Sequence, residues 1–264
     1  MNKGSILYLS HGGGPLPLLG DEAHQEMVGF LKQVTPSLGN PSAILVISAH
    51  WEESKPTLTS GASSSLLYDY QGFPAASYEI KYPAPGAPAL ANKIFNLLKN
   101  NGIDAGLTDR RGFDHGVFVP LKIMYPAATI PCVQLSLVRG LRPDQHIQIG
   151  KALAGLVEDN VLIIGSGFSF HNMRAFFSPS TSDSLAMNEA FEQWLIATCT
   201  NRQLSEADRE QHLLNWDRAP AARYCHPREE HLLPLHVCYG AAGSAANQAF
   251  RFEILGKKAS AYLW

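Results

Sequence analysis

The chain has 264 residues, of which 45% are hydrophobic and 17% are charged, so it is long enough to bury a full core. We expect one domain over residues 1–264, because α/β chains of this size commonly form a single domain. The net charge of −2 and the pI near 6.5 provide no basic field for nucleic acid or an anionic membrane. A small, uncharged or weakly anionic partner is therefore expected.

Neither a membrane span nor a disulfide framework is predicted. The apolar stretches fall well short of the roughly 20 residues that cross a bilayer. The N-terminal segment carries no signal-peptide cleavage pattern, so we expect a cytoplasmic protein that opens with a strand. No CxxC pair occurs among the four cysteines, which are read as buried thiols: Cys132, Cys199, Cys225 and Cys238.

Two early strands each run into a histidine. SILYLS precedes His11, which is followed by three glycines and Pro15, and AILVISA precedes His50. Both runs are typical of buried strands in an α/β sheet. Ligands of such sheets bind beyond the carboxyl ends of the strands. The two imidazoles therefore point at one site, which we interpret as a metal site.

The remaining elements alternate between strands and helices. They predict an α/β fold with a central, mostly parallel or mixed sheet flanked by helices on both faces. Residues 61–88, rich in Gly, Pro, Ser and Tyr, are interpreted as an aromatic wall of a pocket, with a surface excursion as the alternative. The predicted helices span about 22–34, 88–100, 144–158, 184–198 and 206–216, with a short helix after 115 and another from about 229. The predicted strands span 5–10, 43–49, 55–60 (partly exposed), 105–108, 130–137 and 161–170, with a closing hairpin of 250–255 and 259–263.

Five of the ten histidines stand out by their position. Four follow strand ends or loops, and the fifth opens a helix: His11, His50, His115, His171 and His231. Imidazole clusters suit Zn, Fe, Cu or Ni. No HExxH motif is present, so the common helical zinc-protease arrangement is absent.

The other histidines receive structural interpretations. Three lie on polar helix faces and are assigned to solvent: His24, His146 and His212. His226 is interpreted as a loop residue, and His236 as a packing residue or a hydrogen-bond donor behind the site.

Six ordered motifs carry a family resemblance between about residues 5 and 243. They are HGGGP, SAHW, GFP…YPAPGAPALA, GFDHGVFVPLKIMYP, GSGFSFHNMR and HPREEHLLPL. Together they resemble the extradiol aromatic-ring-opening dioxygenases of the protocatechuate 4,5-dioxygenase catalytic-subunit superfamily, class III. The branch that the chain is most similar to is that of the 4,5-DOPA dioxygenases.

The resemblance implies a non-haem metal enzyme that uses O2 to open a catechol next to its diol. It implies His11, His50 and His231 as metal ligands. His171 would lie beside the metal as a fourth ligand or as the acid/base, and His115 would contact a substrate oxygen. Both His171 and His115 are therefore candidate catalytic residues.

One departure from the wider superfamily concerns the metal. Many relatives use two histidines and a glutamate, whereas here the matching position is His231, with Glu230 adjacent. An all-histidine site also suits Zn(II). We expect Fe(II) for turnover and Zn(II) as a metal that purified protein can carry.

Two other functions are compatible with the same residues. One is a zinc-dependent hydrolase of small amides or esters, because histidine-bound zinc with an open position activates water. The other is a non-enzymatic relative that binds a ligand or metal in the same pocket. The sequence fixes neither the catechol nor the oligomeric state, although five aromatic residues are expected to shape substrate choice: Tyr68, Tyr70, Phe73, Tyr78 and Tyr82.

Overall fold

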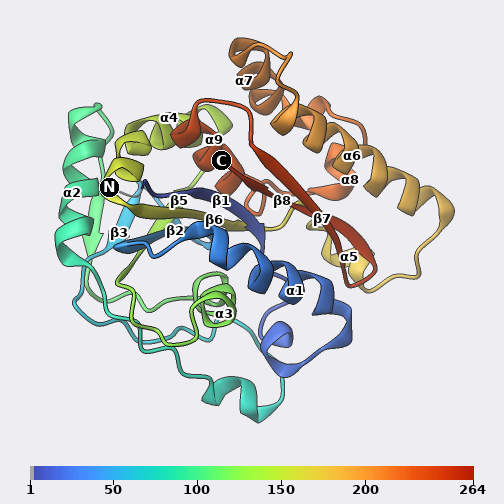
Figure 1. Ribbon diagram of the computed structural model, residues 1–264. Helices are drawn as coiled ribbons and strands as arrows, with labels where there is room; N and C mark the ends of the chain where they lie inside the picture. Colours follow the sequence, from blue (N-terminus) through green and yellow to red (C-terminus); the bar gives the residue numbers. More distant parts are fainter. Residues whose placement is uncertain (1–2) are drawn as a thin grey trace.

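The computed structural model describes residues 3–264 and is built on an eight-stranded mixed sheet with the order β4-β3-β5-β2-β6-β1-β8-β7 (Figure 1). Its four central strands, β5, β2, β6 and β1, are parallel to one another. They are largely buried, which agrees with the continuous apolar runs from which they were predicted. The strands are β1 Ile6–Ser10, β2 Ala43–Glu53, β3 Thr57–Thr59, β4 Gly106–Thr108, β5 Cys132–Val138, β6 Val161–Gly167, β7 Gln248–Ile254 and β8 Lys257–Leu263.

Antiparallel pairs extend the sheet at both sides. β8 pairs with β1, and β7 completes the closing hairpin predicted at the C-terminal end of the chain. On the other side, β3 runs antiparallel to β5 and parallel to β4. The predicted α/β class with a mostly parallel, mixed sheet is confirmed.

Helices cover both faces of the sheet. α4 and α9 pack against each other over β6 on one face, whereas α3 packs on β2 from the other face beside α1 (Figure 1). Within residues 3–264, no helix combines the length and apolarity that a membrane crossing requires. The α-helices are α1 Gln25–Val34, α2 Pro88–Asn100, α3 His115–Met124, α4 Pro143–Leu153, α5 Met173–Phe176, α6 Ser182–Thr200, α7 Glu206–Leu214, α8 Ala222–Cys225 and α9 Leu233–Ala242.

Two element boundaries near the histidines differ from the predictions. β2 does not end at Ala49 but continues through His50, although its pairing with β6 stops at Ser48 and its register with β5 shifts between Ile47 and Glu52. His50 thus lies in an irregular stretch of a strand. The last long helix begins at Leu233 with Pro234 in its first turn, so His231 lies in the preceding turn.

The predictions for His24 and His146 were wrong, because both side chains are fully buried. His24 accepts a hydrogen bond from the Gly13 N–H and faces Asp21 through Nδ1. His146 accepts from the Val138 N–H, and its Nδ1 lies 2.7 Å from the Arg142 carbonyl oxygen. Each histidine has polar partners at both ring nitrogens, which lets it lie inside the protein. His212 is exposed, as predicted, and His236 is buried between two carbonyl oxygens.

Candidate metal centre and substrate cavity

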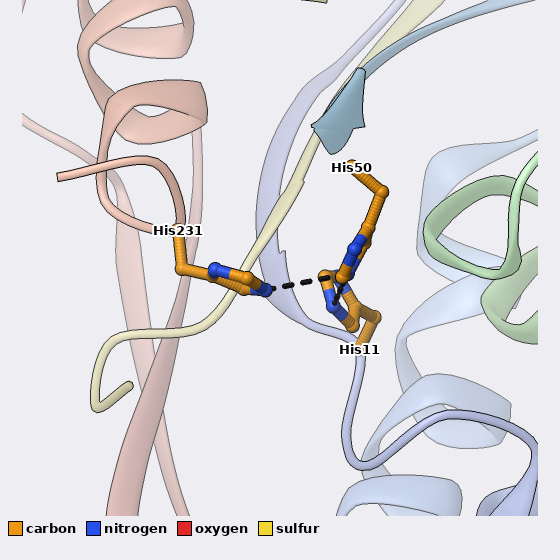
Figure 2. Close-up of side chains that lie close together, drawn as sticks. All are labelled: His11, His50 and His231. Carbon is orange, nitrogen blue, oxygen red and sulfur yellow. Dashed lines mark hydrogen bonds between the residues drawn. The ribbon is translucent and has the colours of Figure 1, made fainter. Parts of the chain in front are cut away.

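Three histidines from distant parts of the chain converge beyond the ends of the central strands. Figure 2 shows the rings of His11, His50 and His231 pointing toward one another from the end of β1, from β2 and from the turn before α9. The Nε2 atoms of His50 and His11 are 2.9 Å apart, and those of His231 and His50 are 3.3 Å apart. One ligand nitrogen from each ring lies within 4.8 Å of the other two.

The outer nitrogen of each ring has its own partner. Ser166 donates its only hydroxyl proton to the Gly116 carbonyl, so it must accept the Nδ1–H of His11 at 3.0 Å. Nδ1 of His231 lies 3.1 Å from Glu230 Oε1, and Nδ1 of His50 lies 3.5 Å from an oxygen of Asp69. These contacts leave the three Nε2 lone pairs facing one another.

This donor set fits a single cation. Burial, followed by the neighbouring imidazoles, holds the pKa of His11 well below 6.5, and burial is also the main cause of the lowered pKa values of His50 and His231. Neutral imidazoles with bare, inward lone pairs repel one another unless a cation lies between them. Two nitrogens each about 2.1 Å from one ion would be about 3.0–3.4 Å apart at ligand angles between about 90° and 109°. The two N···N distances, 2.9 and 3.3 Å, lie close to that range.

The main chain at His231 is held independently of its side chain. Its carbonyl oxygen accepts hydrogen bonds from the Tyr8 hydroxyl and the Phe168 N–H, both at 3.0 Å. The same oxygen would be 2.1 Å from a Cβ at position 167, so only glycine permits this approach. β1 and β6 therefore fix the place from which the third imidazole projects.

Asp69 joins His50 to His115 on one side of the three rings. One of its oxygens accepts the His115 N–H at 3.0 Å and lies 2.8 Å from His115 Nδ1, while the other faces His50. Burial would raise the pKa of Asp69, but the hydrogen bonds and charge of His115 dominate and lower it to about 2. Asp69 is thus an ionised carboxylate that leaves Nε2 of His115 as its available ring nitrogen.

On the other side of the three rings, Glu230 joins His231 to His171, as Asp69 joins His50 to His115. Its Oε1 lies 3.2 Å from Nδ1 of His171 and 3.1 Å from Nδ1 of His231, whose rings stack with centroids 3.4 Å apart. Burial opposes ionisation of Glu230, but the hydrogen bond and charge of His171, a backbone N–H and the charge of Arg228 together outweigh it and lower the pKa. Arg228 also forms an ion pair with Glu230, with 3.4 Å between Nη1 and Oε2. Each flanking histidine therefore shares a carboxylate with one inner histidine.

A buried carboxylate behind His50 holds its backbone. Asp114 accepts hydrogen bonds from Ser48, Arg111 and Gln134, and Arg111 also donates to the His50 carbonyl at 3.1 Å. Ser48 accepts the His50 N–H at 3.2 Å. This network stabilises the irregular part of β2.

The histidines form one wall of a cavity of about 400 Å³. All five predicted site histidines line it, and the rest of its lining is mainly glycine, aliphatic and aromatic: Gly12, Gly13, Gly14, Leu16, Tyr70, Gln71, Phe73, Phe168, Met173, Phe176, Phe177 and Leu255. An apolar slot beside convergent polar nitrogens suits a flat aromatic ring. Gly12 has a φ of +83°, which favours glycine at the turn after His11.

The aromatic segment at 61–88 contributes part of this wall, in agreement with its sequence interpretation. Tyr70 and Phe73 line the cavity, while Tyr68 and Tyr78 pack against Tyr70 behind it. The Tyr70 hydroxyl donates to the Ser77 carbonyl, and this hydrogen bond within the segment stabilises its conformation. Tyr82 is buried elsewhere and does not line the cavity.

The sequence interpretation missed the partners that orient the histidines. Asp69 lies inside the aromatic segment, and Ser166 lies inside a buried strand, so neither stands beside a histidine in the sequence. One feature of the sequence could have pointed to Ser166: it is a polar residue within an apolar run, and such a residue needs a hydrogen-bond partner when buried. For Asp69 only its place between two predicted pocket tyrosines pointed to the site.

The fold and the histidine cluster define an α/β protein with a candidate metal-binding site in the wall of an aromatic cavity. The family model described as "Catalytic LigB subunit of aromatic ring-opening dioxygenase" matches residues 5–262. A 4,5-DOPA dioxygenase extradiol of Beta vulgaris is 40% identical over 92% of this chain and 88% of the relative. Dioxygenase tasH of Hapsidospora irregularis is 38% identical over 100% of this chain and 86% of the relative. A crystal structure of an uncharacterized Escherichia coli K12 protein superposes with a TM-score of 0.79 at 27% identity, covering 99% of each chain.

The chain belongs to the LigB family of extradiol, aromatic ring-opening dioxygenases. It is thus an oxidoreductase of a class that depends on a non-haem metal, and its histidine clusters are consistent with that dependence. These relationships do not favour the zinc-hydrolase or non-enzymatic alternatives.

Proposed function

We propose that this protein inserts O2 into a catechol of the 4,5-DOPA type at a non-haem metal held by His11, His50 and His231. Fe(II) is the metal proposed for turnover. The observation that carries the proposal is the approach of three Nε2 atoms, with their Nδ1 atoms already partnered, beside an aromatic-lined cavity.

Bound Fe(II) would supply Lewis acidity and redox chemistry at this point. Zn(II) fits the same nitrogen donors but does not change oxidation state, so a zinc-loaded protein is expected to be inactive in ring opening. The aromatic wall of Tyr70 and Phe73 holds the catechol ring and excludes water from its face.

Proton transfer is assigned to the two flanking histidines. In His171 and His115, Nδ1 contacts a carboxylate and the ring lines the cavity, so Nε2 is the atom that can take a proton from a substrate hydroxyl. We propose His171 as the acid/base and His115 as the residue that contacts a substrate oxygen. His171 is not within the group of three inner nitrogens, which favours the acid/base role over that of a fourth ligand.

The test is reconstitution of the metal-free protein with Fe(II) under nitrogen, followed by L-DOPA or caffeate and air. Oxygen uptake together with a yellow ring-opened product is expected. Zn(II)-loaded protein provides the matched control and should consume no oxygen. If no catechol in a broad panel is opened, the proposal is wrong.

The role of His171 is tested by His171→Ala. The variant should keep its metal, because the three inner imidazoles remain, while kcat falls by about 10²–10⁴-fold through loss of proton transfer. Metal content is measured beside kcat. Loss of the metal together with activity would instead identify His171 as a ligand.

A further inference from the structure

A second hollow of about 530 Å³ adjoins the catalytic cavity. The two share His171 and Met173 in their linings, so they meet at the start of α5. Among the residues that line the catalytic cavity there is no lysine, arginine or carboxylate, whereas the second hollow is lined by Arg174, Arg228 and Glu230. The Glu230 carboxylate already contacts His171, His231 and Arg228. A charged group on a bound aromatic molecule is therefore best accommodated there.

The two arginines differ in how their charge is used. Arg228 pairs with Glu52 at 2.6 Å and with Glu230 at 3.4 Å, so its charge is already balanced. Over residues 3–264, Arg174 has no carboxylate oxygen within 4.0 Å. It is exposed, and its guanidinium is available to a ligand.

Arg174 is also close enough to the histidines to serve a substrate held there. It follows His171 by three residues, so the two Cα atoms are at most about 11 Å apart. Met173 lines both hollows, and Phe176 lines the catalytic cavity from the same short helix. A ring beside His171 with a short side chain directed past Met173 would bring the end of that chain to Arg174.

We propose that Arg174 binds the carboxylate on the side chain of the substrate and is the residue that makes the enzyme prefer catechols with such a chain. This inference rests on the proposed function and adds a specificity-determining residue to it. The guanidinium group has two parallel N–H donors that match the two oxygens of a carboxylate. The guanidinium of Arg174, which no carboxylate within residues 3–264 neutralises, is the group that selects the substrate.

The test uses three catechols whose side chains differ in charge: dihydrocaffeate (anionic), ethylcatechol (neutral) and dopamine (cationic). KM is measured for the Fe(II)-loaded protein in air, and Kd is measured by calorimetry without O2. For each constant, KM and Kd, we divide the value for dihydrocaffeate by the value for ethylcatechol. In Arg174→Gln this ratio should rise about tenfold. Arg174→Glu should raise it further and should improve dopamine binding relative to ethylcatechol.

Two further variants make the result specific. Arg202→Gln removes an exposed arginine from the turn between α6 and α7 and should leave the ratio unchanged. Arg174→Lys keeps the charge without the paired donors and should restore the ratio only in part. Equal changes for all three catechols, or an unchanged ratio in Arg174→Gln, would overturn the inference. Failure of every catechol to react with wild-type protein would instead overturn the proposed function.

Discussion

Glu192 offers the sharpest test of how burial controls charge in this fold. It lies in α6 with 1% of its surface exposed, and neither carboxylate oxygen has a hydrogen-bond partner among residues 3–264. Burial is the main cause that raises its pKa, to about 7. The unfolded chain should release this proton near the ordinary value of 4.5.

The cost to stability follows from these two values. Below about pH 4 the carboxyl is protonated in both states and has no effect on the pH dependence. As the pH rises, the unfolded state loses the proton first, and the folded state is destabilised by about 1 kcal/mol at pH 5 and about 3 kcal/mol at pH 8. Glu192→Gln keeps the shape and removes the charge, so it should stabilise the protein by these amounts.

The assay is urea unfolding of wild-type and variant protein at pH 5 and pH 8, in the same metal state. The stabilisation by Glu192→Gln should be about 2 kcal/mol larger at the higher pH. Glu253→Gln, which changes an exposed carboxylate on β7, is the control and should alter stability by less than about 0.5 kcal/mol at either pH. A stabilisation independent of pH, or a variant less stable at pH 8, would refute the reasoning.

Two further predictions concern the partners that orient the histidines. Ser166→Ala removes the acceptor of the His11 Nδ1–H and should weaken metal binding about 10–100-fold, as measured by competition with a chromogenic chelator. Ser37→Ala, on a hydroxyl remote from the site that donates to the Val34 carbonyl, should not change it. Asp69→Asn removes the negative charge beside His115 Nδ1 and should lower kcat about 10–100-fold. The pH profile of kcat should change as well. The metal content of the same sample should fall by a smaller factor than kcat. A kcat within twofold of wild type would exclude a positioning role for Asp69.

The sequence predicted the central strands well because their apolar runs are long and buried on both faces. The histidines at their ends followed from the same pattern, and all five line one cavity. His50 was placed just beyond a strand, whereas it lies within an irregular part of β2, because a register shift depends on the neighbouring strand and leaves no local signal.

The parts that were not predicted depend on contacts between distant residues. α5 and α8 contain four residues each, too few to display a helical period. His24 and His146 were assigned to solvent because their helices looked polar there, yet both are buried and accept backbone N–H groups, from Gly13 and from Val138 at the end of β5. Asp69 and Ser166 act on histidines that are 46 and 155 residues away in the chain.

The fixed backbone at His231 has a consequence for how this enzyme family can change over evolution. The bonds from Tyr8 and Phe168 reach a main-chain oxygen that every amino acid possesses. A single codon change at position 231 would therefore replace the proposed nitrogen ligand by an oxygen donor while these backbone contacts stay in place. The donor atom offered at this position can thus change over evolution without a change of fold.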